Sequence, residues 1–375
     1  MKSPIYNIIH TTCHTNWGGL EKRVLNESLW MSDKGHRVSI IAPEKTPLLQ
    51  KAQRHGLNVH PMAFKRLSAL SDYRRLIRIF NHEKPDILNT HGNTDSKIAL
   101  PAAKKAHIPL RILSRHISAP VNGSWYNGLL YKKLSHYTFT TADYTKRHLQ
   151  EVFHLSDHQV FSMPSGIIEP EHLNPKDDER EALAAKLNLA SPTHFIGFAG
   201  RVSQDKGVDI LLNGFHQASG RIPHHLVIAG TGETSYLHRL SQLARDLKIE
   251  DRVHFLGFQE NVWPFYRSLD CKILPSLAGF EGVPQALLEA MYARCPVIGS
   301  KTGGIADIIT HNDTGLLFQV GHPDELCKMI LKTIENPAKT LERSQKAEKK
   351  VKTGHTIDIM GLKIIDIYQN HLGNI

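Results

Sequence analysis

Short apolar runs alternate with helix-length segments along almost the whole chain, and this alternation restricts the fold more than any other feature. An apolar run at 5–9 leads through a helix at 20–34, which Gly35 ends, to a second apolar run at 38–42. This pattern predicts a βαβ unit, in which a helix joins two parallel strands. Further strands are predicted at 86–90, 110–114, 137–140 and 160–163.

The alternation stops once and then restarts, which divides the chain into two domains. After the Pro-Ser-Gly at 164–166, a polar stretch with a short helix at 178–187 precedes a new strand at 195–199. We predict an α/β protein of two doubly wound, Rossmann-like domains, residues 1–165 and 166–356, which face each other across a cleft. The later strands are predicted at 226–229, 253–256, 271–274 and 296–299.

Composition excludes several other classes of protein. Of the 375 residues, 41% are hydrophobic and 22% are charged, as in globular proteins and unlike disordered chains. No apolar run approaches the roughly 18 residues that span a bilayer, and the first residues lack the apolar stretch of a signal peptide. We therefore expect a cytoplasmic protein.

Cysteine and histidine usage gives no indication of a metal site. The cysteines lie far apart without a C-x-x-C pair, so neither a disulfide framework nor a cysteine zinc site is predicted. The 24 histidines are scattered and form no H-E-x-x-H motif. We expect no bound metal, and we expect reduced, mostly buried thiols at Cys13, Cys271, Cys295 and Cys327.

Positive charge is concentrated in the first half of the chain. Residues 1–165 hold 23 Lys and Arg against 11 Asp and Glu, whereas the remaining residues hold 23 against 25. This asymmetry predicts an anionic partner, either a nucleic acid or a membrane surface. A basic nucleic-acid-binding protein is therefore the non-enzymatic alternative. The absence of a recognisable binding module argues against it, and we expect no nucleic acid as a partner.

Glycine-rich and basic segments follow predicted strands, at the edge where doubly wound folds bind ligands. Gly18 and Gly19 precede the first helix and would let the backbone approach a phosphate, although an ordinary tight turn explains them equally well. The loop that begins at Gly200 carries Arg201 and Lys206, five residues apart. Two cations so placed can clamp two phosphates, whereas in isolation they are most often solvated loop residues.

The most specific segment runs from Gly279 to Met291. With Pro284 at the first helical position, Glu281 is a loop residue, and Glu289 lies about 7.5 Å from Pro284 along the helix axis. One acid can reach a sugar and the other a ribose, while the free N–H groups at the helix start offer an anion site. Without the other motifs, the two acids have an ordinary explanation. Glu281 would be an acid favoured near the helix start by the helix dipole, and Glu289 would be a surface glutamate.

Taken together, these motifs resemble glycosyltransferase family 4. The chain carries Gly-Gly-x-Glu from Gly18, G-R-x-x-x-x-K-G from Gly200, Glu-x7-Glu from Glu281, and Gly303–Gly304–Ile305, in this order. The resemblance covers residues from about 5 to about 330 and is strongest to bacterial transferases that build lipopolysaccharide core or O-antigen. It implies retaining enzymes of the GT-B fold, whose last helix, here 357–375, packs back on the first domain. Ala306–Asp307 stands where Pro-Glu is frequent in the family.

The resemblance implies a role for each matching residue. Arg201 and Lys206 would hold the donor diphosphate, Glu281 would contact hydroxyls of the transferred sugar, and Glu289 would bind the ribose. His116, at a strand end, would approach the sugar ring, unless it simply caps the strand. The expected catalytic residues are His116, Arg201, Lys206 and Glu281, and the expected donor-binding residues are Gly18, Gly19, Gly200, Arg201, Lys206, Gly230, Glu281, Gly282, Val283 and Glu289.

The implied reaction moves a sugar from a UDP- or GDP-sugar to a lipid-linked or lipopolysaccharide-type saccharide. No D-x-D motif is present, so we expect neither metal nor cofactor, and the two cations would stabilise the departing nucleoside diphosphate. Front-face attack, in which the leaving phosphate accepts the proton of the acceptor hydroxyl, would make Glu281 a binder. A nucleotide-sugar 2-epimerase of the same fold is the enzymatic alternative, and the Glu-x7-Glu spacing argues against it.

A membrane surface is the anionic partner expected for the basic half. Trp125 and Tyr126 adjoin Lys132 and Lys133 in a segment that can form a helix, a combination that interfacial helices use. We expect peripheral binding at the cytoplasmic face of the inner membrane, where a lipid-borne acceptor would be presented. The same segment is explained equally well if its apolar residues belong to the core or line the acceptor pocket, beneath a solvated basic face.

Overall fold

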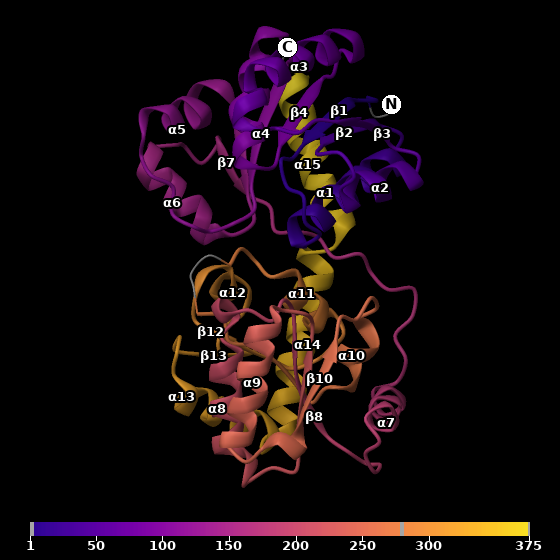
Figure 1. The fold of residues 1–375 in the computed structure, drawn as a ribbon, viewed down its shortest axis with the longest axis vertical. Coiled ribbons are helices and arrows are strands. Elements are labelled where there is room, and N and C mark those ends of the chain that lie inside the picture. Colours follow the sequence, from indigo (N-terminus) through magenta and orange to yellow (C-terminus); the bar gives the residue numbers. More distant parts are fainter. Residues whose placement is uncertain (1–3, 278–280, 374–375) are drawn as a thin grey trace. The chain divides into compact units, whose positions relative to one another are not determined.

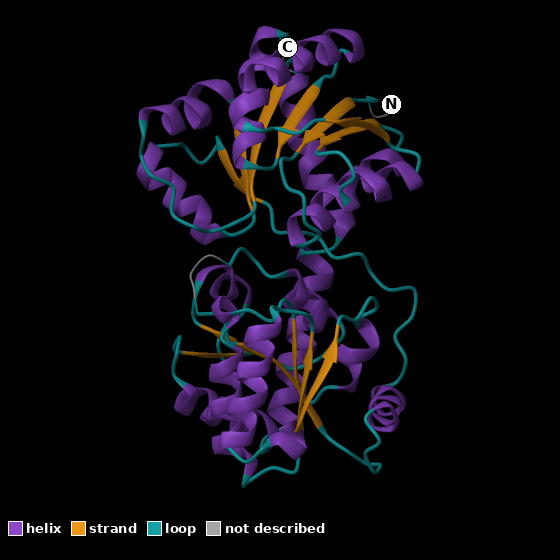
Figure 2. Ribbon diagram, viewed as in Figure 1, coloured by secondary structure: helices purple, strands orange, loops and turns teal. Residues whose placement is uncertain are grey.

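Both halves of the chain fold into parallel sheets flanked by helices, which confirms the predicted fold class (Figures 1 and 2). The structure is a computed structural model and describes residues 4–277 and 281–373. The chain divides into two compact units. The first unit runs to Ile168 and resumes at Thr356, and the second spans Glu169–His355. These limits lie three residues from the predicted division at 165/166.

The first unit contains a seven-stranded parallel sheet. Its elements are β1 (Asn7–Thr11), α1 (Gly19–Asp33), β2 (Arg37–Ala42), α2 (Pro47–Arg54), β3 (Asn58–Pro61), η1 (Arg66–Ser68), α3 (Ala69–Glu83), β4 (Ile87–Thr90), α4 (Asn93–Lys105), β5 (Leu110–Arg115), α5 (Trp125–Leu129), η2 (Leu130–Leu134), β6 (Tyr137–Thr140), α6 (Asp143–Phe153), β7 (Val160–Ser162) and α15 (Ile357–Leu372). The strand order is β3-β2-β1-β4-β5-β6-β7. The order reverses between β1 and β4, where doubly wound sheets bind ligands at the carboxyl ends of their strands.

The second unit contains a six-stranded parallel sheet in the order β10-β9-β8-β11-β12-β13. Its elements are α7 (Lys176–Lys186), β8 (Phe195–Ala199), η3 (Gln204–Lys206), α8 (Val208–Ser219), β9 (His225–Ala229), α9 (Thr234–Asp246), η4 (Glu250–Arg252), β10 (Val253–Gly257), α10 (Trp263–Ser268), β11 (Cys271–Leu274), α11 (Gln285–Tyr292), β12 (Val297–Ser300), α12 (Gly303–Ile308), β13 (Leu316–Phe318), α13 (Pro323–Ile334) and α14 (Pro337–Gly354).

Two strands and one helix face differ from the sequence prediction. The edge strand β3 was not predicted because its four residues are exposed or half-buried and end in proline. Strand β13 has three residues, too few for a periodic signal. From its charge alone, the stretch 339–352 is expected to be a solvated helix face, but Arg343, Ala347 and Val351 of α14 are buried.

The C-terminal helix α15 belongs to the first unit, and Figure 1 shows it, in yellow, beside α1. Met360, Ile364 and Tyr368 recur at helical spacing and join the core that also contains Tyr6, Ile8 and Trp30. The fit is close, since a Cβ at Gly361 would lie 2.4 Å from the Trp30 ring. The Trp30 Nε1–H donates to the Asp358 carboxylate at 2.6 Å.

Truncating the buried face of α15 should therefore destabilise the first unit. Ile364 is fully buried, whereas Leu362 on the same helix is 61% exposed. Ile364→Ala is expected to lower the free energy of unfolding by about 2–5 kcal/mol, because it leaves a cavity. Leu362→Ala should change it by less than about 0.5 kcal/mol. Urea unfolding of the two variants compares them, and equal effects would contradict this packing.

Candidate active site

The loops after β8 and β9 touch through their backbones. Gly200 has φ +153° and Gly230 has φ +139°, which side chains rarely permit. A Cβ at Gly230 would lie 1.8 Å from the carbonyl oxygen of Gly200. The Val202 N–H donates to the Thr231 carbonyl at 2.8 Å. Both glycines are therefore required by geometry at the carboxyl edge of the sheet, where both were predicted to bind the donor.

Lys206 and Glu281 form an ion pair at this edge. Lys206 ends η3, and its Nζ contacts both carboxylate oxygens of Glu281. The two side chains are only 16% and 17% exposed. Gly207 follows with φ +65°, and a Cβ there would lie 2.1 Å from the carbonyl oxygen of Pro275. The fold thus brings together two residues that are 75 positions apart in the sequence.

Arg201 and Lys206 share one loop but differ in their surroundings. The Arg201 side chain is 69% exposed, and its Nη2 donates to Asp205 Oδ2 at 3.2 Å. Exposed pairs of this kind are weak, so the guanidinium can turn toward a ligand at little cost. Lys206 is thus the half-buried cation of the loop, and Arg201 is the exposed one.

The segment after Glu281 is supported from the loop that begins α12. The Gly304 N–H donates to the Glu281 carbonyl at 2.9 Å. A Cβ at Gly304 would lie 2.3 Å from the backbone of both Gly282 and Val283. This hydrogen bond forms although Ala306–Asp307 replaces the family's frequent Pro-Glu. Gly279 and Phe280, the start of the predicted motif, lie outside the described residues.

Helix α11 begins one residue later than predicted, and Pro284 is its N-cap residue with an extended backbone. Glu289 lies on this helix and is half-buried. The Tyr266 hydroxyl donates to Glu289 Oε2 at 3.2 Å. Burial, together with the Glu289 charge, raises the pKa of Tyr266 well above its ordinary value, so this hydroxyl stays a donor. The hydroxyl of the buried Tyr266 therefore holds in place the carboxylate of Glu289, which was predicted to bind the ribose.

Lys272 is a residue that sequence reasoning missed. It lies on β11 and is fully buried, and its Nζ has no hydrogen-bond partner among the described residues. Burial lowers its pKa to about 8, while the negative charges of neighbouring groups, among them Glu289 and Glu281, act in the opposite direction. A lysine inside the apolar run 271–274 was the available signal. The structure places a buried cation beside both acids of the Glu-x7-Glu motif.

In the first unit, a pocket of about 370 Å³ opens at the carboxyl ends of β4 and β5. His116 lines it and follows β5 directly. His116 Nε2 lies 2.8 Å from His91 Nδ1, and burial lowers the pKa of both rings well below the ordinary value. Other lining residues are His14, Leu20, Asn93, Lys97, Asn122, Asn127 and Tyr131.

Gly18 and Gly19 lie at the start of α1 in the same unit. The Gly18 N–H donates to Glu21 Oε2 at 2.8 Å. Gly18 has an extended backbone with φ −152°, and a Cβ at Gly19 would meet nothing within 4 Å. The backbone therefore does not require either glycine, and open space for a ligand remains at the helix start.

The segment predicted to face a membrane is exposed only in part. Trp125 is 79% exposed, and Lys132 and Lys133 are exposed as well. Tyr126 is half-buried, and its hydroxyl donates to the Lys97 carbonyl at 3.1 Å. Leu130, which lies close to these lysines in the sequence, is buried in the core of the first unit. The apolar contact with a membrane would therefore come from the Trp125 ring.

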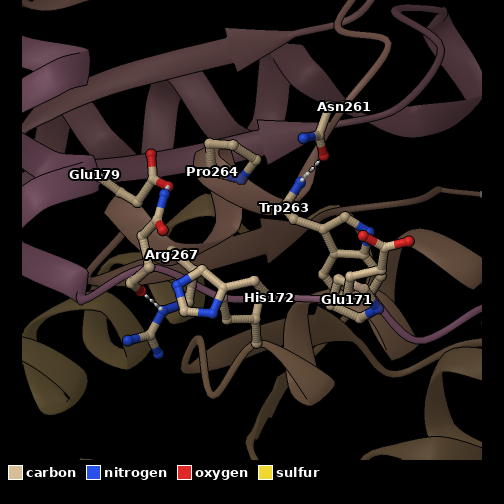
Figure 3. Close-up of a pocket in the computed structure, with 10 residues that line it drawn as sticks. Glu171, His172, Glu179, Asn261, Trp263, Pro264 and Arg267 are labelled. Atoms are coloured by element: carbon tan, nitrogen blue, oxygen red, sulfur yellow. Dashed lines mark hydrogen bonds between the residues drawn. The ribbon is translucent and has the colours of Figure 1, made fainter.

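A second pocket, of about 410 Å³, lies in the second unit between the segment 170–174 and α10 (Figure 3). The Trp263 N–H donates to Asn261 Oδ1 at 3.1 Å, and Arg267 Nε donates to the Asn174 carbonyl at 3.0 Å. Trp263 and Glu171 are among the residues that line this pocket (Figure 3). None of the predicted site residues lines it.

One group among the described residues has the composition of a metal site: His194, His224 and Asp270. Asp270 Oδ2 lies 2.9 Å from His194 Nδ1 and 3.5 Å from His224 Nε2. Its other oxygen pairs with Lys176 and Arg180 at 2.8 and 2.6 Å. These two cations already neutralise the carboxylate and would repel a divalent ion, so the group is best described as an ion-pair network.

Two parallel-sheet units, with loops gathered at the carboxyl ends of their strands, form the architecture of the GT-B class of glycosyltransferases. Comparison with protein families supports this class. Residues 17–168 match the model "Glycosyltransferase Family 4", and residues 179–351 match "Glycosyl transferases group 1". The chain belongs to this family of enzymes.

Individual proteins show the same likeness. The chain is 26% identical to an uncharacterised glycosyltransferase of Haemophilus influenzae, over 88% of this chain and 90% of that protein. It is 26% identical to the lipopolysaccharide core biosynthesis mannosyltransferase LpcC of Rhizobium leguminosarum, over 48% of this chain and 52% of LpcC. The chain spans about half the length of several of its curated relatives.

A solved structure, that of Anabaena HepE in complex with UDP, superposes with a TM-score of 0.83 at 17% identity. The superposition covers 97% of this chain and all of the HepE chain. At this level of identity the likeness concerns the fold.

The buried lysine should make stability depend on pH. Because folding lowers the Lys272 pKa from 10.5 to about 8, the unfolded state binds more protons than the folded state between these values. The free energy of unfolding should therefore rise with pH in this window, by about 2 kcal/mol between about pH 8 and about pH 10. Urea unfolding of the wild type and of Lys272→Met isolates this contribution, since the variant lacks the titrating group. A difference between the two proteins that does not change with pH would contradict the prediction.

Proposed function

We propose that this glycosyltransferase moves a sugar from a nucleotide-sugar donor to a lipid-linked or lipopolysaccharide-type saccharide. The observation that carries the proposal is the Lys206–Glu281 ion pair, which joins the loop after β8 to the segment before α11. Around it, the glycine loops after β8, β9 and β12 pack closely at one edge of the sheet, where Gly230 and Gly304 leave no room for a side chain.

The second unit would bind the donor. Arg201 and Lys206 would hold the diphosphate, Glu281 would contact the sugar and Glu289 would contact the ribose. The UDP in the HepE complex supports a uridine donor, and a GDP-sugar remains the second candidate. The exposed Arg201 guanidinium can reach an arriving phosphate because its present partner, Asp205, holds it weakly.

We propose that the reaction retains the anomeric configuration and needs no metal. The Lys206 ammonium, which contacts the Glu281 carboxylate, makes that carboxylate a poor nucleophile and supports a binding role for it. With Arg201, the same ammonium would stabilise the negative charge that develops on the departing diphosphate. The leaving phosphate would accept the proton of the attacking hydroxyl.

The first unit would bind the acceptor in the pocket that His116 lines. LpcC, a lipopolysaccharide core mannosyltransferase, supports a saccharide acceptor of this type. Ile117, at the pocket, is 55% exposed and Trp125 is 79% exposed, so both offer apolar surface to a lipid-linked substrate. No described helix combines the length and the hydrophobicity that crossing a bilayer requires. We propose peripheral attachment at the cytoplasmic face of the inner membrane.

Removing either cation of the donor loop should slow transfer. Lys206→Ala and Arg201→Ala are each expected to lower kcat by about 100-fold, which corresponds to on the order of 3 kcal/mol of charge stabilisation. Lys328→Ala, a change at an exposed lysine on α13, should leave kcat unchanged. Sugar release from UDP- and GDP-sugars, measured in EDTA with an acceptor glycolipid, provides the assay.

Three results of this assay would contradict the proposal. Normal turnover in either variant would exclude the phosphate clamp. Loss of wild-type activity in EDTA would exclude the metal-free reaction. Epimerisation of the donor sugar without an acceptor would assign the chain to the epimerases.

Binding to vesicles should depend on two lysines of the first unit. A lysine near an anionic bilayer contributes about 1 kcal/mol to binding. The double variant Lys132→Glu, Lys133→Glu is therefore expected to lower the partitioning of the protein onto anionic vesicles by about 30-fold or more. The matched control, Lys328→Glu with Lys349→Glu, makes the same change of charge in the second unit and should have little effect. Co-sedimentation with vesicles of neutral or anionic lipid measures both, and equal binding to the two lipids would exclude the membrane proposal.

A further inference from the structure

Three histidines from neighbouring strands are in contact at the carboxyl edge of the first unit's sheet. His10 lies on β1, His91 follows β4 and His116 follows β5, and these strands are adjacent in the order β1-β4-β5. His10 Nδ1 lies 2.8 Å from His91 Nε2, and His91 Nδ1 lies 2.8 Å from His116 Nε2. The three rings therefore form one continuous hydrogen-bonded chain that ends at the pocket.

The rings of this chain are neutral. His10 is fully buried and His91 is 3% exposed. Burial lowers the pKa of all three rings, for His91 and His116 to well below the ordinary value. A neutral imidazole has one N–H and one lone pair, and each contact in the chain needs one of each. The direction of one hydrogen bond therefore fixes the direction of the other.

The buried end of the chain determines that direction. His10 Nε2 has no hydrogen-bond partner in the described part of the chain. The nearby carboxylate of Glu27 already accepts from Arg23 Nε at 2.9 Å and from the Asn89 amide at 3.5 Å. A buried N–H without a partner is rarer in proteins than an unpaired acceptor, so Nε2 of His10 carries the lone pair and Nδ1 carries the hydrogen.

We propose that this chain holds His116 in the Nδ1–H form and so makes it a hydrogen-bond donor to a sugar hydroxyl in the pocket. His10 donates to His91, and His91 donates to His116 Nε2, which leaves the His116 Nδ1–H for the ligand. His10 and His91 are positioning residues. The identity of the ligand as a sugar rests on the proposed function, whereas the ring form of His116 does not.

The ring form can be measured directly in the wild-type protein. With 15N-labelled histidine, long-range proton–nitrogen correlations within each ring distinguish an Nδ1–H ring, an Nε2–H ring and a doubly protonated ring. The His116 signals are assigned by their absence from His116→Ala. We expect an Nδ1–H ring at His116 at neutral pH. An Nε2–H ring or a doubly protonated ring would overturn the proposal, and neither result depends on whether the protein transfers a sugar.

Two variants at position 91 form a matched pair. The amide nitrogen of asparagine is as many bonds from the backbone as Nδ1 of histidine, whereas that of glutamine corresponds to Nε2. In His91→Asn, the side-chain amide can still donate to His116. In His91→Gln, the side-chain amide can contact only His10. We expect His91→Asn to keep the Nδ1–H ring and a kcat near that of the wild type.

In His91→Gln, His116 should lose its fixed ring form, and kcat should fall about tenfold while KM for the donor stays unchanged. Thermal unfolding confirms that both variants are folded. Identical ring forms and rates in the two variants would overturn the positioning role. If neither variant folds, the ring form in the wild type still decides the proposal, and if no transfer is found in any protein, the nitrogen spectra alone decide it.

Discussion

Parallel strands place all their carboxyl ends at one edge of a sheet, and the functional geometry of this protein depends on that constraint. Each strand is followed by a loop at the same edge, so residues far apart in sequence meet there without any long excursion of the chain. In the second unit the loops approach so closely that Gly230 and Gly304 leave no room for a side chain. The glycine pattern is thus a packing requirement.

In the second unit, two lysines interact with the acids of the Glu-x7-Glu motif. Lys206 neutralises Glu281 at the surface of the site, and Lys272 lies buried beside both Glu281 and Glu289. A buried ammonium without a hydrogen bond is costly, and its cost is reduced by the two carboxylates near it. Glu281 therefore has an ion-pair partner in Lys206, and both acids of the Glu-x7-Glu motif offset part of the cost of burying Lys272.

The sequence predicted the fold class, and it placed the candidate site residues after strands, because strand and helix periodicity is a local signal. It did not predict β3 and β13, which are too short or too exposed to have such a signal. Pairing of Lys206 with Glu281 could not be read from spacing, since it depends on which strands are neighbours in the sheet. Lys272 was visible as a charge in an apolar run, but its burial beside two acids required coordinates.

The histidines illustrate the same limit. Only His116 was indicated in advance, by the family resemblance, and the roles of His10 and His91 became visible only because β1 and β4 are adjacent. Conversely, Leu130 shows how an apolar residue beside lysines can belong to a core instead of to a membrane-facing surface.

Helix α15 makes the first unit discontinuous, and this has a consequence for synthesis on the ribosome. Trp30 and Tyr6 emerge early, but their partners Met360, Ile364 and Tyr368 are translated only after the whole second unit, Glu169–His355. At usual elongation rates the second unit alone takes roughly 10 to 40 s to translate. When that translation is complete, the second unit has its whole sequence and can fold, whereas the first unit still lacks the helix that completes its apolar core. The first unit of this enzyme therefore completes its folding last, and its exposed apolar surface is the one that a chaperone would have to cover until then.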